Sequence, residues 1–159
     1  MKIPTSRFGQ VEIDPQAIIS MPRGLIGFPE QKRYIILRHN PESPFFWFQA
    51  VDAPDLAFVI VDPLIFKPDY DVPLPKPLLA DLKAVKPEDL GIYVIVTIPT
   101  GHPEKMTANL LGPLLINTAS RLARQLVLDK SRYSHRFAIL AGQGPDEDQT
   151  EEKHPENQT

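Results

Sequence analysis

The sequence predicts a mainly β protein: one small antiparallel β-barrel-like domain with one or two short helices. Of its 159 residues 18 are proline, about twice the usual share of ~5%, and proline breaks helices because it lacks an N–H. Short apolar segments also recur along the chain, each bounded by Pro, Gly, Asp or Asn. A chain of this length can bury a hydrophobic core in a single domain.

Eight apolar segments are the expected strands: residues 8–13, 17–21, 34–37, 45–49, 56–61, 92–98, 110–116 and 122–128. Such a series is typical of an antiparallel barrel or sandwich. Residues 57–61 and 92–96 are apolar without interruption, which is typical of strands covered on both faces. We therefore expect these two strands at the centre of the sheet.

One segment has helical spacing instead. Leu78, Leu79, Leu82 and Val85 recur along one helix face between Pro77 and Pro87, which predicts a helix of about two turns. Residues 86–90 predict a further turn. Residues 114–144 contain no proline and also show helical spacing, but 125–129 and 133–140 resemble strands, so we read this stretch as mainly β.

The domain is expected to span residues 1–141, followed by a disordered acidic tail, residues 142–159. Apart from His154, the tail has no aliphatic or aromatic side chain, so it cannot offset the entropy of ordering. The net charge of the chain is −3, of which the tail contributes −5, so residues 1–141 carry +2. A nearly neutral domain provides no field that would attract nucleic acid in general.

The sequence predicts no enzyme, cofactor or metal site. It has no cysteine, its four histidines (His39, His102, His135 and His154) are scattered, and no glycine-rich phosphate loop is present. Residues 23–28 contain two glycines, which we interpret as a loop with positive φ. Neither a signal peptide nor a membrane span is apparent, so we expect a soluble cytoplasmic protein that does not bind membranes.

The aromatic run at residues 45–48 is a candidate binding feature. In a strand Phe46 and Trp47 point to opposite faces. One of the two faces packs into the core, and the other is a stacking platform for bases or a seat for a protein partner. Acidic neighbours such as Asp52 and Asp55 are unfavourable for phosphate, which favours core packing or a protein interface.

Residues 52–71 contain five aspartates, Asp52, Asp55, Asp62, Asp69 and Asp71, with Lys67 as the one basic residue. They are either solvated turn residues or an acidic patch that binds a basic protein; Asp69 and Asp71 are our candidate contacts. A basic stretch follows later, comprising Arg121, Arg124, Lys130, Arg132 and Arg136. It is either a solvated strand face or a groove for nucleic acid.

The chain resembles the FliW family of flagellar assembly factors in four pieces: residues 23–29, 46–63, 106–117 and 125–128. The resemblance implies a β-barrel-like protein without catalysis that binds newly made flagellin in the cytoplasm. When flagellin is scarce, such proteins bind the RNA-binding translational regulator CsrA, which then no longer represses flagellin mRNA. The chain itself is expected to bind no nucleic acid and to be a monomer when free.

Within residues 106–117, Asn109 and Asn117 lie eight positions apart and share a face if the strand between them is regular. A bulge at Gly112-Pro113 would change that relation. The two side chains either contact a partner or cap turns.

Two other functions stay open. One is a β-barrel RNA-binding module that uses Phe46 or Trp47 together with the basic stretch. The other is a small hydrolase that gathers Ser, His and Asp from distant loops, since such triads are recognised in space.

Overall fold

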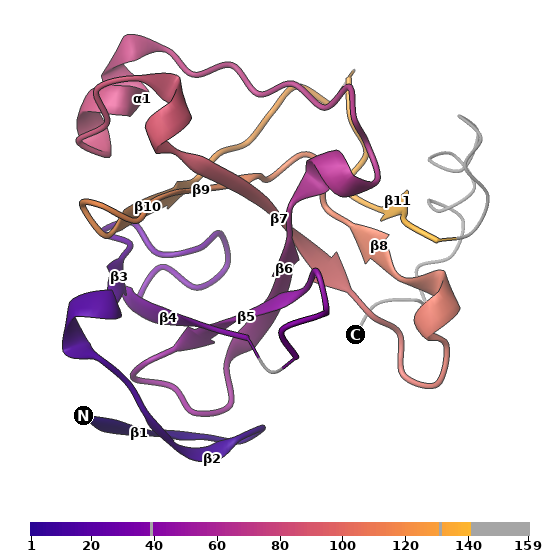
Figure 1. Ribbon diagram of the computed structural model, residues 1–159. Helices are drawn as coiled ribbons and strands as arrows, with labels where there is room; N and C mark the ends of the chain where they lie inside the picture. The colour runs from indigo at the N-terminus through magenta and orange to yellow at the C-terminus, as the bar shows by residue number, and fades with distance from the viewer. Residues whose placement is uncertain (39, 131, 141–159) are drawn as a thin grey trace.

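The computed structural model describes residues 1–38, 40–130 and 132–140, so the predicted acidic tail, His39 and His154 lie outside the described residues. Seven strands form a closed barrel (Figure 1). They are β3 (Ile19–Ser20), β4 (Arg33–Leu37), β5 (Phe46–Ala50), β6 (Ala57–Val61), β7 (Gly91–Thr97), β9 (Leu114–Asn117) and β10 (Leu122–Gln125). The order around the barrel is β7-β6-β5-β4-β3-β10-β9, and β9 closes it by pairing with β7. The predicted mainly β, barrel-like fold is confirmed.

Smaller elements surround the barrel. β8 (Thr107–Ala108) and β11 (Phe137–Ala138) extend the sheet from the end of β7, and β1 (Lys2–Thr5) pairs with β2 (Gly9–Glu12) as a separate hairpin. Among the described residues, the α-helix is α1 (Lys76–Asp81), and the 3-10 turns are η1 (Pro15–Ala17), η2 (Pro63–Ile65), η3 (Pro87–Asp89) and η4 (Pro103–Lys105). No helix among the described residues is long and apolar enough to cross a membrane.

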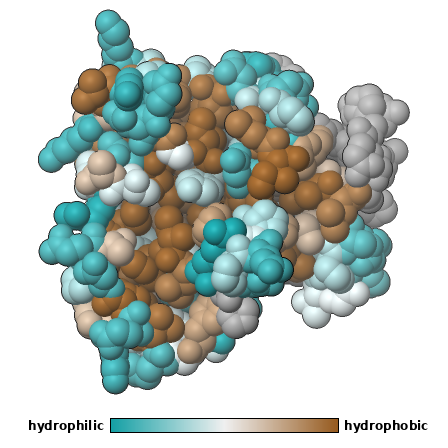
Figure 2. Space-filling model, in the orientation of Figure 1, coloured by the Kyte–Doolittle hydropathy of each residue, from teal (hydrophilic) through white to brown (hydrophobic). Residues whose placement is uncertain are grey.

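Where they pair with each other, β6 and β7 are covered on both faces, as their unbroken apolar runs predict. Ile60 points into the barrel interior, where it is buried with Tyr34 and Phe48. Its neighbour Val61 and the opposed Val94 are buried on the outer side, against a cluster that includes side chains of α1. Figure 2 shows hydrophobic residues gathered within the ring of barrel strands and beside β7. The strand wall therefore separates two cores, each of which stabilises the barrel by removing apolar area from water.

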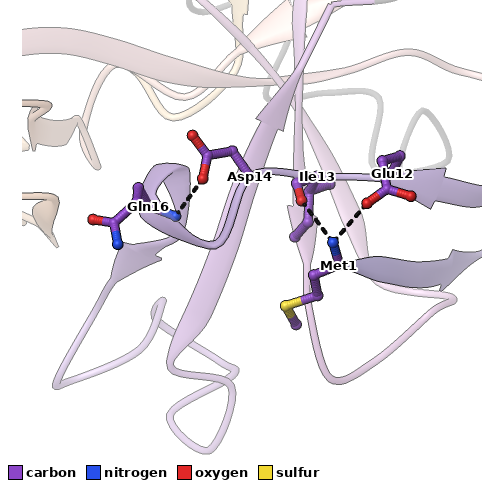
Figure 3. A network of polar contacts seen from close by, with 5 residues as sticks. All are labelled: Met1, Glu12, Ile13, Asp14 and Gln16. Carbon is purple, nitrogen blue, oxygen red and sulfur yellow. Dashed lines mark hydrogen bonds and ion pairs between the residues drawn. The ribbon is translucent and has the colours of Figure 1, made fainter.

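The N-terminal hairpin forms a third, smaller core on the outer side of β4. Its Ile3 and Ile13 are buried with Ile35 and Val51. The amino group of Met1 donates to Glu12 Oε2 at 2.6 Å and to the Ile13 carbonyl at 3.2 Å (Figure 3). β1 was not among the predicted strands, because Pro4 argues against a ladder position. It is accommodated because β1 is an edge strand.

The predicted helix is shorter than its spacing indicates. α1 ends at Asp81, and Lys83 adopts a φ of 55°, a left-handed conformation that stops a helix. Val85 is consequently 90% exposed and does not join the buried helix face, so the prediction was wrong for residues 82–85. The further turn predicted at residues 86–90 is present as η3.

Two predicted strands are also shorter. Residues 110–113 form a turn and β9 begins at Leu114, because Asn109 Oδ1 accepts hydrogen bonds from the N–H groups of Leu111 and Gly112. β10 ends at Gln125, and within residues 133–140 only the two residues of β11 are strand. The described part of 114–144 contains no helix, in agreement with the mainly β reading.

Candidate protein-binding surface

An exposed apolar pair follows β6. In η2, Leu64 and Ile65 are 52% and 60% exposed. The turn is held by Asp62, whose Oδ1 accepts a hydrogen bond from the Leu64 N–H at 2.9 Å, and Pro63 starts it with a φ suited to a first helical position. Two adjacent large apolar side chains exposed on a capped turn are a candidate contact for another protein.

Two of the candidate acids lie on the same loop. Asp69 is exposed, and its Oδ1 lies 3.1 Å from Lys67 Nζ; this hydrogen bond holds the pKa of Asp69 below its usual value. Asp71 is also exposed. We call residues 62–71 the acidic loop: its three aspartates against one lysine give it a charge of −2 at neutral pH.

A buried tyrosine fixes the acidic loop to the barrel. Tyr70, which lies between the two acids, donates from its hydroxyl to the Leu110 carbonyl at 2.6 Å. The backbone N–H of Asp71 donates to the Tyr133 hydroxyl at 2.9 Å. Both tyrosines are buried, so Asp69 and Asp71 project from an anchored backbone and need little ordering when a partner binds.

The other two aspartates of the predicted patch lie elsewhere. Asp52 accepts hydrogen bonds of 2.6 and 3.0 Å from Arg33, which lower its pKa, and Asp55 accepts one from Ser6. Both precede β6, whereas the acidic loop follows it. The strand between them spans about 17 Å at ~3.3 Å per residue. The expectation of a single patch of five acids was therefore wrong.

Phe46 and Trp47 point to opposite sides of β5, and an arginine side chain lies over each ring. Phe46 packs with the barrel-interior cluster, and the Arg38 guanidinium lies 4.7 Å from the centre of its ring. Trp47 lies on the outer side, edge-on to Phe8, with the Arg7 guanidinium 4.4 Å from its ring centre. Both residues are half-buried.

Asn109 and Asn117 do not share a strand face, because Asn109 lies in the turn before β9. Asn117 is 2% exposed. Its Nδ2 donates to the carbonyls of Leu82 and Lys83, and its Oδ1 accepts from the N–H groups of Ala119 and Ser120. The structure shows turn capping for both residues, and Asn117 is too enclosed to form part of a contact surface.

The basic stretch does not form one face. Arg136 is buried, Arg124 donates to Asp81 Oδ2 at 2.8 Å, and Arg132 donates to the Tyr133 hydroxyl. Of the five basic residues, Arg124 is the one that lies in a strand. The RNA-binding alternative thus loses the basic strand face on which it depended. Among the described residues, no three His, Asp or Glu side chains gather in a way that could hold a metal ion.

A second apolar surface comes from residues 23–29, where the predicted positive φ is confirmed: Gly24 has φ 65° and Gly27 φ 92°. A Cβ on Gly24 would lie 2.5 Å from the Phe28 carbonyl oxygen, so only glycine fits there. This tight loop leaves Ile26 and Phe28 60% and 40% exposed.

Leu64, Ile65 and Phe28 were not predicted to lie on the surface, because apolar side chains are expected first in the core. For Leu64 and Ile65 the sequence does contain an indication of exposure. Asp62-Pro63 combines a capping residue with proline at the first position of a turn, which ends β6 and directs the next residues outward.

Comparisons with known proteins agree with one another. The family model described as "FliW protein" matches residues 2–139. The chain is 44% identical over 140 residues to the flagellar assembly factor FliW of Syntrophus aciditrophicus, with 88% of each chain covered. It is 40% identical over 141 residues to that of Moorella thermoacetica, covering 88% of this chain and 89% of the relative. A crystal structure of the flagellar assembly factor FliW superimposes with a TM-score of 0.82 at 32% identity, covering 89% of this chain and 99% of that one.

Proposed function

The chain belongs to the FliW family of flagellar assembly factors, and from this premise we propose that it binds flagellin and, when flagellin is scarce, the regulator CsrA. The proposed role is that of a cytoplasmic binding protein, monomeric when free and without catalysis. By binding CsrA it relieves the repression of flagellin mRNA. The names of the two partners follow from the family resemblance, and the structure adds a surface suited to one of them.

The acidic loop is the observation that supports CsrA as a partner. A protein that binds RNA carries a basic surface, because contacts with phosphate dominate its affinity. Asp69 and Asp71 place negative charge on the same loop as the exposed Leu64 and Ile65. Apolar contacts surrounded by charges of opposite sign are typical of protein interfaces. Bound there, the acidic loop occupies the basic surface and repels phosphate from it.

Exchange between the two partners follows from mass action. If the complexes with flagellin and with CsrA exclude each other, free flagellin draws the chain away from CsrA in proportion to its concentration and affinity. No chemical step is required. The amount of unassembled flagellin then sets how much CsrA is free to bind mRNA.

One titration distinguishes RNA binding by the chain from RNA binding by CsrA. A fluorescently labelled RNA that carries a CsrA site is mixed with this chain alone, with CsrA alone, and with both at physiological salt. We expect no binding to the chain alone, and weaker binding to CsrA when the chain is present. Retention of the RNA by the chain alone would support the RNA-binding alternative, and unchanged RNA binding by CsrA would overturn the proposal.

A further inference from the structure

The ladder between β6 and β7 ends before it reaches the first two residues of β6. Its register runs from Val61 opposite Val94 to Val59 opposite Val96 and stops there. In this register Phe58 would next lie opposite Thr97 and Ala57 opposite Ile98, but neither pair forms. On its other side the end of β7 pairs with β8 (Figure 1). There Val96 lies opposite Ala108 and Thr97 opposite Thr107. The start of β6 and the end of β7 therefore diverge.

The backbone N–H and C=O groups of successive residues in a strand point alternately to its two neighbours. This alternation shows which backbone groups the divergence leaves unpaired. The Ala50 N–H donates to the Leu56 carbonyl, so in β6 the even-numbered residues bond to β5 and the odd-numbered ones face β7. On β7, Ile95 accepts from the Asn109 N–H on the β8 side, so its even-numbered residues face β6. Ala57 and Ile98 thus each direct an N–H and a carbonyl into the gap, with no ladder partner among the described residues.

The gap is an apolar groove. Its volume is about 630 Å³, within the range of ~300–1,000 Å³ that ligand sites occupy. Leu56, Ala57 and Phe58 line one side and Val96, Thr97 and Ile98 the other. Phe28 and Trp47 also line the groove, and Ile98 and Phe28 are 36% and 40% exposed. Free backbone groups beside exposed apolar side chains are the arrangement to which an extended peptide adds as a strand.

Arg7 adds a charge to the apolar lining. It is the one ionisable residue that lines the groove, and it lies on the Trp47 ring. It forms no ion pair with any described carboxylate. A guanidinium held on an aromatic ring keeps its N–H groups available to a carboxylate.

We propose that this groove binds an extended segment of a partner protein by strand addition. The segment pairs its backbone with Ala57 and Ile98, places alternate apolar side chains against Trp47 and Phe28, and carries an acidic residue that reaches Arg7. The site is separate from the acidic loop, which follows the opposite end of β6. It does not depend on the identity of flagellin or CsrA.

The test selects nonapeptides from a random displayed library against the purified chain, excluding sequences with tryptophan. Trp47 is the one tryptophan in the chain, so its fluorescence reports occupancy of the groove. We expect selected peptides to alternate apolar residues and to carry Asp or Glu. Methylation of a backbone nitrogen that faces the groove should weaken binding about tenfold, whereas methylation of the next nitrogen, which faces solvent, should have little effect.

A charge reversal supplies an independent readout that leaves the core intact. Arg7→Glu should weaken the binding of an acidic peptide. It should restore the binding of the same peptide with Lys in place of its acidic residue. Lys130→Glu, at another exposed site, should change the binding of neither peptide. Failure of the library to yield peptides that shift Trp47 fluorescence would overturn the proposal, as would insensitivity to N-methylation or to Arg7→Glu. Self-association of the chain through Trp47, seen by sedimentation, would assign the groove to a second copy and also overturn it.

Discussion

The Nδ2 of Asn117, on β9, donates a hydrogen bond to the backbone carbonyl of Leu82 across 2.9 Å. The two residues are 35 positions apart, and the bond connects the end of α1 to the turn between β9 and β10. Ser120 Oγ donates to the same carbonyl at 2.9 Å. The side chain of Asn117 thus stabilises the left-handed backbone at Lys83 that ends the helix.

Replacing this asparagine should destabilise the fold. Asn117→Ala leaves the N–H groups of Ala119 and Ser120 without their acceptor, which costs about 1–3 kcal/mol in the free energy of unfolding. Urea denaturation measures the change. Gln10→Ala, at an exposed position of β2, is the control and should stay within ~0.5 kcal/mol of the parent. Equal effects of the two substitutions would show that Asn117 has no structural role.

Two buried tyrosines should respond oppositely to loss of the hydroxyl. Tyr34 is stacked on Phe48 with ring centres 4.4 Å apart, and its hydroxyl has no hydrogen-bond partner among the described residues. The Tyr70 hydroxyl donates to the Leu110 carbonyl. Tyr34→Phe should therefore raise the free energy of unfolding, whereas Tyr70→Phe should lower it by about 1 kcal/mol, as measured by urea denaturation at pH 7. Destabilisation by Tyr34→Phe would contradict this reading.

Tyr34 also makes the stability of the fold depend on pH, in a direction that follows from its pKa. Burial raises the pKa of Tyr34 to about 12, whereas an unfolded tyrosine titrates near ~10. Because the folded state holds the Tyr34 proton more tightly, this difference in pKa contributes to the free energy of unfolding. The contribution is complete below pH ~10 and is lost as pH rises toward 12. Thermal melts across this window should show a smaller loss of stability in Tyr34→Phe than in the parent chain. Parallel curves would show that Tyr34 does not contribute.

The sequence predicted the parts of the fold that local pattern controls. β6 and β7 were predicted because a strand that lies between two cores has apolar residues on both faces. η3 was predicted because Pro87 and Asp89 are suited to a short turn. The early end of α1 was missed because it depends on Asn117, which is distant in the chain. β1 was missed because the pattern does not show that Pro4 lies on an edge strand.

The candidate site was predictable only in part. Asp69 and Asp71 stand out in the sequence as acids with little compensating charge, and both are exposed in the structure. Sequence could not separate them from Asp52, which Arg33 binds from a neighbouring strand. The groove was not visible either, because it depends on where pairing between β6 and β7 stops, and that is a property of two strands separated by some thirty residues of chain.

Charge reversal on the acidic loop should weaken the complex with CsrA. Asp69→Lys with Asp71→Lys replaces attraction by repulsion, which slows association and changes its dependence on salt. Calorimetric titration at low and physiological salt measures the effect. The control, Glu30→Lys with Glu42→Lys, makes the same change in net charge at other exposed positions. Melting temperatures should hardly change for either double variant, and unaltered CsrA binding at both salt concentrations would exclude Asp69 and Asp71 as contacts.

Competition between flagellin and CsrA for the chain distinguishes an exchange of partners from independent binding. Labelled RNA with a CsrA site is first bound by CsrA, this chain is added until the RNA is released, and monomeric flagellin is then titrated in. We predict that flagellin restores the CsrA–RNA complex, with half-recovery at a flagellin concentration that rises with the amount of the chain present, as mass action requires. RNA that stays released at saturating flagellin would contradict the proposed exchange of partners.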